Sequence, residues 1–87
     1  MYSIRYMLSA AQEMEELDSS IAKRIYNRIK WLAENFDALT PETLEGDWKG
    51  KFKFRVGDYR IVYTVNQKEN YLMIHMVRHR REAYRRR

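Results

Sequence analysis

The chain has 87 residues, of which 45% are apolar and 14% aromatic, so it can bury one hydrophobic core and is not disordered throughout. It contains no cysteine and two histidines, which excludes a disulfide framework and a thiolate metal site and leaves too few ligands for a typical structural zinc site. The net charge of +5 is uneven, because residues 1–45 carry five Lys/Arg against eight Asp/Glu while residues 46–87 carry twelve against four. This basic second half indicates a phosphate-bearing or acidic partner, with a generally solvated basic surface as the alternative.

No apolar run approaches the roughly 18 residues that a membrane span needs. The first residues also lack the long apolar core and the small-residue cleavage site of a signal peptide. We therefore expect a cytoplasmic protein with one domain over residues 1–87, no membrane segment, no metal and no cofactor.

The N-terminal half predicts one strand and two helices. Residues 2–8 alternate loosely between apolar and polar side chains, which is typical of a strand. Ser9 and Gln12 have the spacing of a capping box and predict that a helix follows Ser9. Residues 18–20 break this helix and cap the next one, whose apolar stripe predicts an antiparallel two-helix hairpin. That stripe consists of Ile21, Ile25, Ile29, Leu32 and Phe36.

The second half begins with a loop over residues 35–48 and continues with a strand hairpin. Residues 51–56 alternate cation and apolar residue, residues 59–65 form a second strand, and Gly57-Asp58 suits a two-residue II′ turn. This turn sets Val56 opposite Tyr59 and leaves two opposite faces on the hairpin. The cationic face carries Lys51, Lys53, Arg55 and Arg60, and the apolar face carries Phe52, Phe54, Val56, Tyr59, Ile61 and Tyr63. Like charges opposite one another destabilise a sheet, so the cationic face indicates an anionic ligand.

Residues 66–70 form a polar turn, and the apolar run of residues 71–77 predicts a central strand. His75 lies within this run and is interpreted as a satisfied core or sheet residue rather than a catalytic one. The predicted fold class is α+β: an N-terminal strand, a two-helix hairpin, a three-stranded antiparallel sheet, and a short C-terminal helix or tail. The helices are expected to cover the apolar face of the sheet.

The residues favour phosphodiester chemistry on RNA over other kinds of hydrolysis. The chain has no glycine-rich phosphate loop, no nucleophile elbow and no paired carboxylates suited to a cleft. RNA supplies its own nucleophile, the 2′-hydroxyl, so the protein needs only to move protons and to neutralise the charge of the transition state. Arginine, lysine, histidine and tyrosine can do this, although the same residues occur in proteins that bind nucleic acid without cleaving it.

Two segments resemble the RelE/ParE superfamily of bacterial toxins. They are the hairpin of residues 48–63 and the closing His79-Arg80-Arg81-Glu82-Ala83-Tyr84. The order of strand, two helices and three strands is similar too, so the resemblance covers nearly the whole chain. It implies a type II toxin that is held inactive by a cognate antitoxin. The RelE branch cleaves messenger RNA in the ribosomal A site, whereas the ParE branch poisons DNA gyrase.

The resemblance also implies site residues, and these favour the RelE branch. Lys51 and Lys53 match the paired strand lysines that act as base and phosphate contact, and Arg60 matches the arginine that stabilises the transition state. Arg80 matches an arginine that stabilises or protonates the leaving group, and Tyr84 matches a tyrosine that stacks on the substrate base. His79 is the further catalytic candidate, so the base and acid assignments stay open between Lys51/Lys53 and His79/Arg80. The substrate-binding candidates are Arg55, Arg78 and Arg81.

Overall fold

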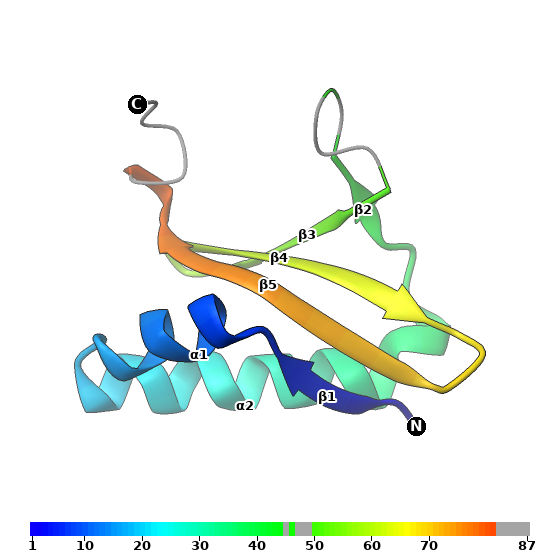
Figure 1. Ribbon diagram of the computed structural model, residues 1–87, viewed down its shortest axis with the longest axis horizontal. Coiled ribbons are helices and arrows are strands. Elements are labelled where there is room, and N and C mark those ends of the chain that lie inside the picture. The colour runs from blue at the N-terminus through cyan, green and yellow to red at the C-terminus, as the bar shows by residue number, and fades with distance from the viewer. Residues whose placement is uncertain (45, 47–49, 82–87) are drawn as a thin grey trace.

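The computed structural model describes residues 1–44, 46 and 50–81, and it has the α+β fold that the sequence predicts (Figure 1). Strand β1 (Ser3–Tyr6) leads into helix α1 (Leu8–Glu15), helix α2 (Ser19–Asn35) and the short 3₁₀ helix η1 (Phe36–Ala38). The remaining strands are β2 (Glu42–Thr43), β3 (Phe52–Val56), β4 (Tyr59–Asn66) and β5 (Tyr71–His79).

The sheet is larger than predicted. It has five strands in the order β1-β5-β4-β3-β2, with β1 parallel to β5 and the other neighbours antiparallel. The three predicted antiparallel strands are present as β3, β4 and β5, and two further strands extend the sheet at its edges. Strand β1 joins as one edge by pairing parallel to β5, the last strand of the chain. Strand β2 is only two residues long and lies inside the predicted loop, where no periodic pattern could reveal it.

The core lies between α2 and one face of the sheet, as the apolar stripe predicts. Ile25, Ile29 and Leu32 of α2 are at most 2% exposed and pack against buried residues of β3, β4 and β5. The sheet residues of this cluster are Val56, Ile61, Tyr63, Leu72, Ile74 and Val77. Each large side chain buried in this way contributes about 1.5–3 kcal/mol. Within the ranges described, no helix is both long and apolar enough to cross a membrane.

The β3–β4 hairpin has the predicted register. Val56 pairs with Tyr59, Arg55 with Arg60, and Phe54 with Ile61. Gly57 has a φ of +58°, whereas Asp58 is not among the residues with positive φ. Positive φ at the first turn position alone is the signature of a II′ turn, which confirms the prediction.

The start of α1 differs from the prediction. The helix begins at Leu8, so Ser9 lies inside it, and the residue before the helix, Met7, makes no side-chain cap. The reason is that the Met7 N–H donates to the Ile74 carbonyl at 3.0 Å, so pairing with β5 continues up to the first helical residue. Ser9 therefore lies one residue inside the helix, past the position of an N-cap. The break before α2 does occur, with Asp18 as the residue preceding the helix.

Glu13 attaches α1 to β5. Pairing between β1 and β5 ends at Tyr6 and Ile74, which leaves the following edge of β5 without a strand neighbour. The Glu13 carboxylate accepts the Val77 N–H at 2.8 Å and the Arg78 Nε–H at 2.7 Å. One carboxylate thus satisfies an edge donor of the sheet and neutralises a cation beside it.

Replacing Glu13 should therefore cost stability. Glu13→Ala leaves the half-buried Val77 N–H without its acceptor, and we expect a loss of about 1–3 kcal/mol in the free energy of unfolding, measured by urea denaturation. Glu15→Ala, an exposed position on the same helix, is the matched control. Equal unfolding midpoints for the two variants would show that the Glu13 contacts add nothing.

Gly57→Ala should also destabilise the protein. The left-handed backbone at this position costs a residue with a Cβ about 1–2 kcal/mol. The added Cβ would in addition meet the Arg24 Nη2 at 2.7 Å. Arg24→Ala removes the side chain that the new Cβ would meet, so we expect it to relieve this contact but not the backbone cost. Thermal unfolding of both single variants and the double variant separates the two effects; unchanged stability of Gly57→Ala would contradict the assigned turn.

Candidate functional site

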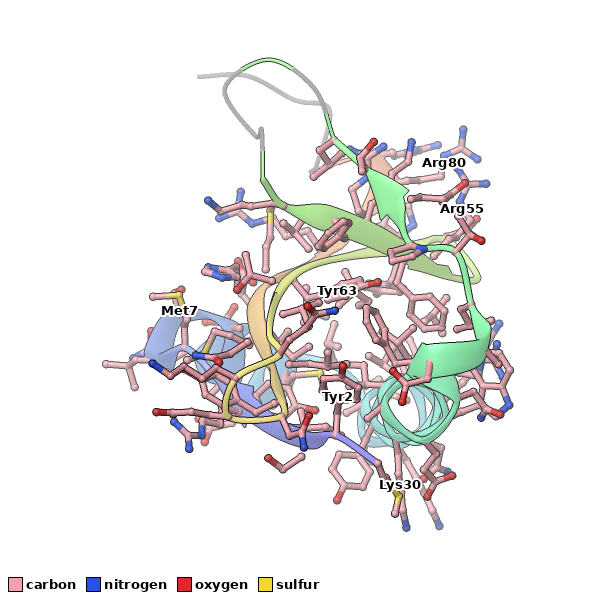
Figure 2. All side chains as sticks on the ribbon, turned by 90° about the vertical axis from the view of Figure 1, so that its right-hand side faces the viewer. Tyr2, Met7, Lys30, Arg55, Tyr63 and Arg80 are labelled. Carbon is pink, nitrogen blue, oxygen red and sulfur yellow. The ribbon has the colours of Figure 1, made fainter. Side chains whose placement is uncertain are left out.

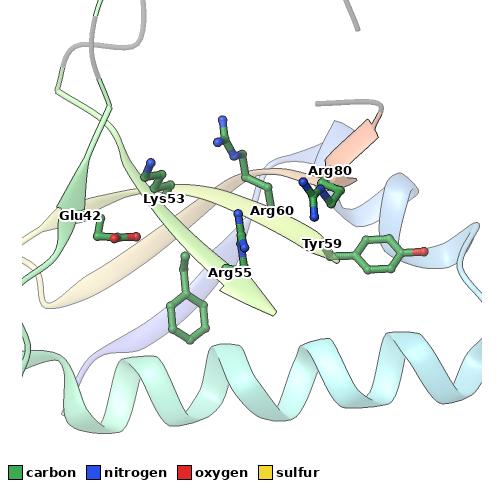
Figure 3. A pocket seen from close by; sticks show the side chains of 7 residues that line it. Glu42, Lys53, Arg55, Tyr59, Arg60 and Arg80 are labelled. Atoms are coloured by element: carbon green, nitrogen blue, oxygen red, sulfur yellow. The ribbon is translucent and has the colours of Figure 1, made fainter. Parts of the chain in front are cut away.

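Four cations surround an open pocket of about 330 Å³ at the β3 side of the sheet (Figure 3). Its lining residues are Glu42, Lys53, Phe54, Arg55, Tyr59, Arg60 and Arg80. The side chains of Lys53, Arg60 and Arg80 extend to the same side of the ribbon in Figure 3. Sequence reasoning named all four cations in advance, and the tertiary structure brings them together.

Each cation is positioned by regular hydrogen bonding. Lys53 and Arg55 alternate on β3, and Arg60 lies directly opposite Arg55 on β4. Arg80 follows β5 and is far from the hairpin in the sequence. Its backbone N–H nevertheless donates to the Asp58 carbonyl at 2.6 Å. This bond ties the end of β5 to the hairpin turn. Figure 2 shows Arg55 and Arg80 at the same end of the molecule.

The pocket concentrates positive charge on the face opposite the helices. Arg55, Arg60 and Arg78 are neighbours across three strands, since Arg60 pairs with both of the others. The Arg78 side chain is 44% exposed and forms an ion pair with Glu13, so its charge is partly neutralised. Arginine forks bind the oxygens of a phosphate in pairs. The arrangement therefore suits a phosphate group held by arginine and lysine side chains.

Glu42 is the functional candidate that sequence reasoning missed. It lies on β2, pairs with Lys53 on β3, and is the one carboxylate among the described residues that line the pocket. Burial, together with the charge of Glu42, raises the pKa of Tyr63 to about 12. A strand of two residues has no periodic pattern, so the sequence did not indicate β2. Pro41, which precedes the strand, is a residue type tolerated at strand edges. Among the residues described, no group of three or more His, Asp or Glu could hold a metal ion.

Lys51 and His75 form a second part of the same open face. Lys51 directly precedes β3, whose pairing with β4 ends at Phe52 and Tyr63. Burial and, to a lesser extent, the charge of Lys51 lower the pKa of His75. The His75 Nε2 lies 2.9 Å from the Thr64 Oγ1. Lys51 is not among the residues that line the pocket. His75 is a sheet residue, as interpreted, but its half-buried side chain faces away from the core.

The remaining candidates are placed differently. His79 pairs with Tyr59, with ring centroids 5.3 Å apart, and both line a pocket with Ile21 and Ile25 of α2. His79 therefore lies on the helix side of the sheet, and it does not line the cationic pocket. Arg81 is exposed and its N–H donates to the His79 Nδ1 at 3.2 Å. Tyr84 lies outside the described residues.

A family model identifies the family of this chain. Residues 4–84 match the family model of the ParE toxin of type II toxin–antitoxin systems. None of the curated proteins compared with the chain matches it.

Solved structures share the fold at low sequence identity. The RelBE2 toxin–antitoxin complex from Mycobacterium tuberculosis matches with a TM-score of 0.80 and 22% identity, over 90% of this chain and 96% of that one. The isolated E. coli RelE toxin matches with a TM-score of 0.75 and 16% identity, over 91% and 84% of the two chains. The YoeB/ParE toxin from Agrobacterium tumefaciens matches with a TM-score of 0.72 and 24% identity, over 88% and 96%.

The family model covers nearly the whole chain, and the predicted strand, helix and hairpin order is the one observed. The chain therefore belongs to the ParE toxin family and is a type II toxin–antitoxin toxin of the RelE/ParE superfamily.

Proposed function

We propose that this toxin is a ribosome-dependent endoribonuclease that cleaves messenger RNA in the A site and thereby stops translation. The observation that carries the proposal is the convergence of Lys53, Arg55, Arg60 and Arg80 on one pocket that also contains a carboxylate. A toxin that only occluded a protein target would not need phosphate-binding side chains from three separate segments around one cavity. Because its target is the translating ribosome, we expect it to act in the cytoplasm.

The proposed reaction needs no group beyond the chain and the RNA. The 2′-hydroxyl loses its proton and its oxygen bonds to the adjacent phosphorus, while the bond from phosphorus to the next 5′-oxygen breaks. That oxygen takes up a proton, so the products are a 2′,3′-cyclic phosphate and a free 5′-hydroxyl. The transition state carries extra negative charge on the phosphate oxygens, and fixed cations around it lower the barrier.

The residues divide into phosphate contacts and proton carriers. Lys53, Arg60 and Arg80 line the pocket, which supports a role for them in holding the phosphate oxygens. For the base, the family resemblance suggests Lys51 or Lys53. Lys51 does not line the pocket, so Lys53 and Glu42 are the two candidates within it. A carboxylate is ionised at neutral pH and can accept a proton directly. Tyr84 stays a predicted base-stacking residue, and His79 stays a predicted acid or base that its position on the helix side does not favour.

A cognate antitoxin is the proposed protein partner. The related RelBE2 toxin was solved as a toxin–antitoxin complex. Residues 46–87 of the present chain carry a strong excess of positive charge. An acidic or amphipathic antitoxin segment that covers the pocket would neutralise this charge and exclude RNA at the same time.

Gyrase inhibition is the second candidate function, because the matching family model is that of ParE toxins. A supercoiling assay with purified DNA gyrase and primer extension on translated messenger RNA separate the two candidates. Codon-positioned cuts that require ribosomes, with gyrase active, support the nuclease. Blocked supercoiling with intact transcripts would reject it.

Arg60→Ala should abolish cleavage without unfolding the protein. Loss of one charge-stabilising donor typically lowers the rate by about 10²–10³-fold, and the exposed part of Arg60 faces the pocket rather than the core. Arg60→Lys should retain part of the activity, because it keeps the charge but loses the fork. Primer extension in a translation reaction gives the rates. Lys68→Ala, in the exposed β4–β5 turn, is the control, and an Arg60→Ala rate equal to it would reject the role.

Glu42→Gln distinguishes the candidate bases. If Glu42 accepts the 2′-hydroxyl proton, the single-turnover rate should fall by about 10²-fold or more. The matched control is Glu69→Gln, which removes an exposed carboxylate from the β4–β5 turn. A rate for Glu42→Gln equal to that of the control would return the base role to Lys53.

A further inference from the structure

The open face of the sheet continues beyond the cationic pocket. Pairing across β3, β4 and β5 arranges its side chains in rows. One row joins Arg55, Arg60 and Arg78, and the next joins Lys53, Val62 and Met76. Beyond these rows, Thr64 of β4 contacts His75 of β5, and the charge of Lys51, the residue before β3, acts on the same imidazole. None of these three residues lines the pocket.

His75 reaches the open face because the strand is irregular there. Tyr63 pairs with Ile74 and Val62 pairs with Met76, so His75 is an extra residue without a partner on β4. Such bulges re-aim side chains and are frequent beside binding sites. Because of the bulge, the Val77 side chain lies in the core, whereas the His75 ring lies against Thr64 on the opposite side of the sheet.

The His75 ring is a neutral, flat surface beside a cation. Burial lowers its pKa, and the charge of Lys51 lowers it further. The Thr64 hydroxyl, 2.9 Å from Nε2, fixes the plane of the ring. Met73 pairs with Thr64 and Met76 follows His75, so apolar side chains flank the imidazole. Neutral aromatic rings next to basic residues are a common means of holding an unpaired RNA base.

The spacing of the rows exceeds the size of one phosphate. Alternate residues of an extended chain are about 6.7 Å apart, so Lys51, just before β3, and Arg55 are separated by about 13 Å. A single phosphate in the pocket leaves Lys51 without an anion. A single-stranded nucleic acid that runs along the face brings a second phosphate within reach of Lys51.

We propose that Lys51, Thr64 and His75 form a second nucleotide subsite for single-stranded RNA, adjacent to the cationic pocket. His75 stacks on the base of the neighbouring nucleotide, Thr64 positions the ring, and Lys51 contacts the phosphate. This inference rests on the proposed RNA-directed function. It adds a residue, His75, that contacts substrate without taking part in proton transfer.

RNA with 2′-O-methyl groups tests the subsite apart from cleavage, because it has no 2′-hydroxyl to attack. The full chain is titrated by NMR with a 2′-O-methyl dinucleotide, which fills the pocket, and with a tetranucleotide, which reaches both subsites. We expect the tetranucleotide to bind more tightly and to shift the amide signals of Thr64 and His75. His75→Ala should weaken tetranucleotide binding about tenfold and leave dinucleotide binding unchanged.

Two further variants test whether the loss of binding arises from misfolding or from a general loss of positive charge. Thr64→Val keeps the side-chain shape and should weaken tetranucleotide binding in the same direction as His75→Ala. Lys51→Gln should reduce the salt slope of tetranucleotide binding by about 0.7, whereas Lys68→Gln in the β4–β5 turn should not.

The outcomes of cleavage and binding are independent. Intact transcripts in translation reactions would reject the nuclease proposal, yet length-dependent binding that requires His75 would still support the subsite. The subsite is overturned if His75→Ala and Thr64→Val bind the tetranucleotide as tightly as the unaltered chain. It is also overturned if they weaken dinucleotide and tetranucleotide binding equally.

Discussion

The cationic pocket exists because the other side of the β3–β4 hairpin is buried against α2. Ile61 and Tyr63 are at most 1% exposed on that side, and strand periodicity then places Arg60 on the opposite face of the sheet. Val62 lies on that opposite face too, although its side chain is only 1% exposed. A slip of one residue would exchange the two faces and bury the arginine. The II′ turn at Gly57 removes this freedom, because it sets the pairing from Val56 and Tyr59 onwards. Hydrophobic burial thus orients the cations that line the pocket.

The same arrangement is electrostatically unfavourable in the free protein. Arg55, Arg60 and Arg78 lie side by side across three strands, and like charges in such positions repel. Two carboxylates from other elements offset part of the repulsion: Glu13 of α1 pairs with Arg78, and Glu42 of β2 lies in the pocket. The remaining excess of charge favours any ligand that brings phosphates, and equally an acidic protein segment. A phosphate-bearing ligand and an acidic protein segment would therefore compete for this surface through the same electrostatic attraction.

The candidate site was predictable where it lies on regular strands and unpredictable where it does not. The alternation over residues 51–56 identified Lys53 and Arg55, and the turn identified Arg60 as their neighbour. Glu42 left no signal, because a two-residue strand has no period. The side of the sheet on which His79 lies depends on the bulge at His75, which shifts the alternation of β5 by one residue. The same bulge gives His75 its place on the open face, which an apolar run could not indicate.

The sequence by itself determined the α+β class, the two helices, the hairpin register and the family, because these follow from local periodicity, from one glycine turn and from contiguous motifs. The tertiary structure decided what depends on contacts between distant segments. It made β1 a parallel edge of a five-stranded sheet and started α1 directly after a hydrogen bond to β5. It brought Arg80 to the hairpin through the Asp58 carbonyl and set Glu42 among the cations. Local sequence specifies which face a side chain takes on a regular strand, but only the pairing of strands decides which side chains from other segments lie beside it.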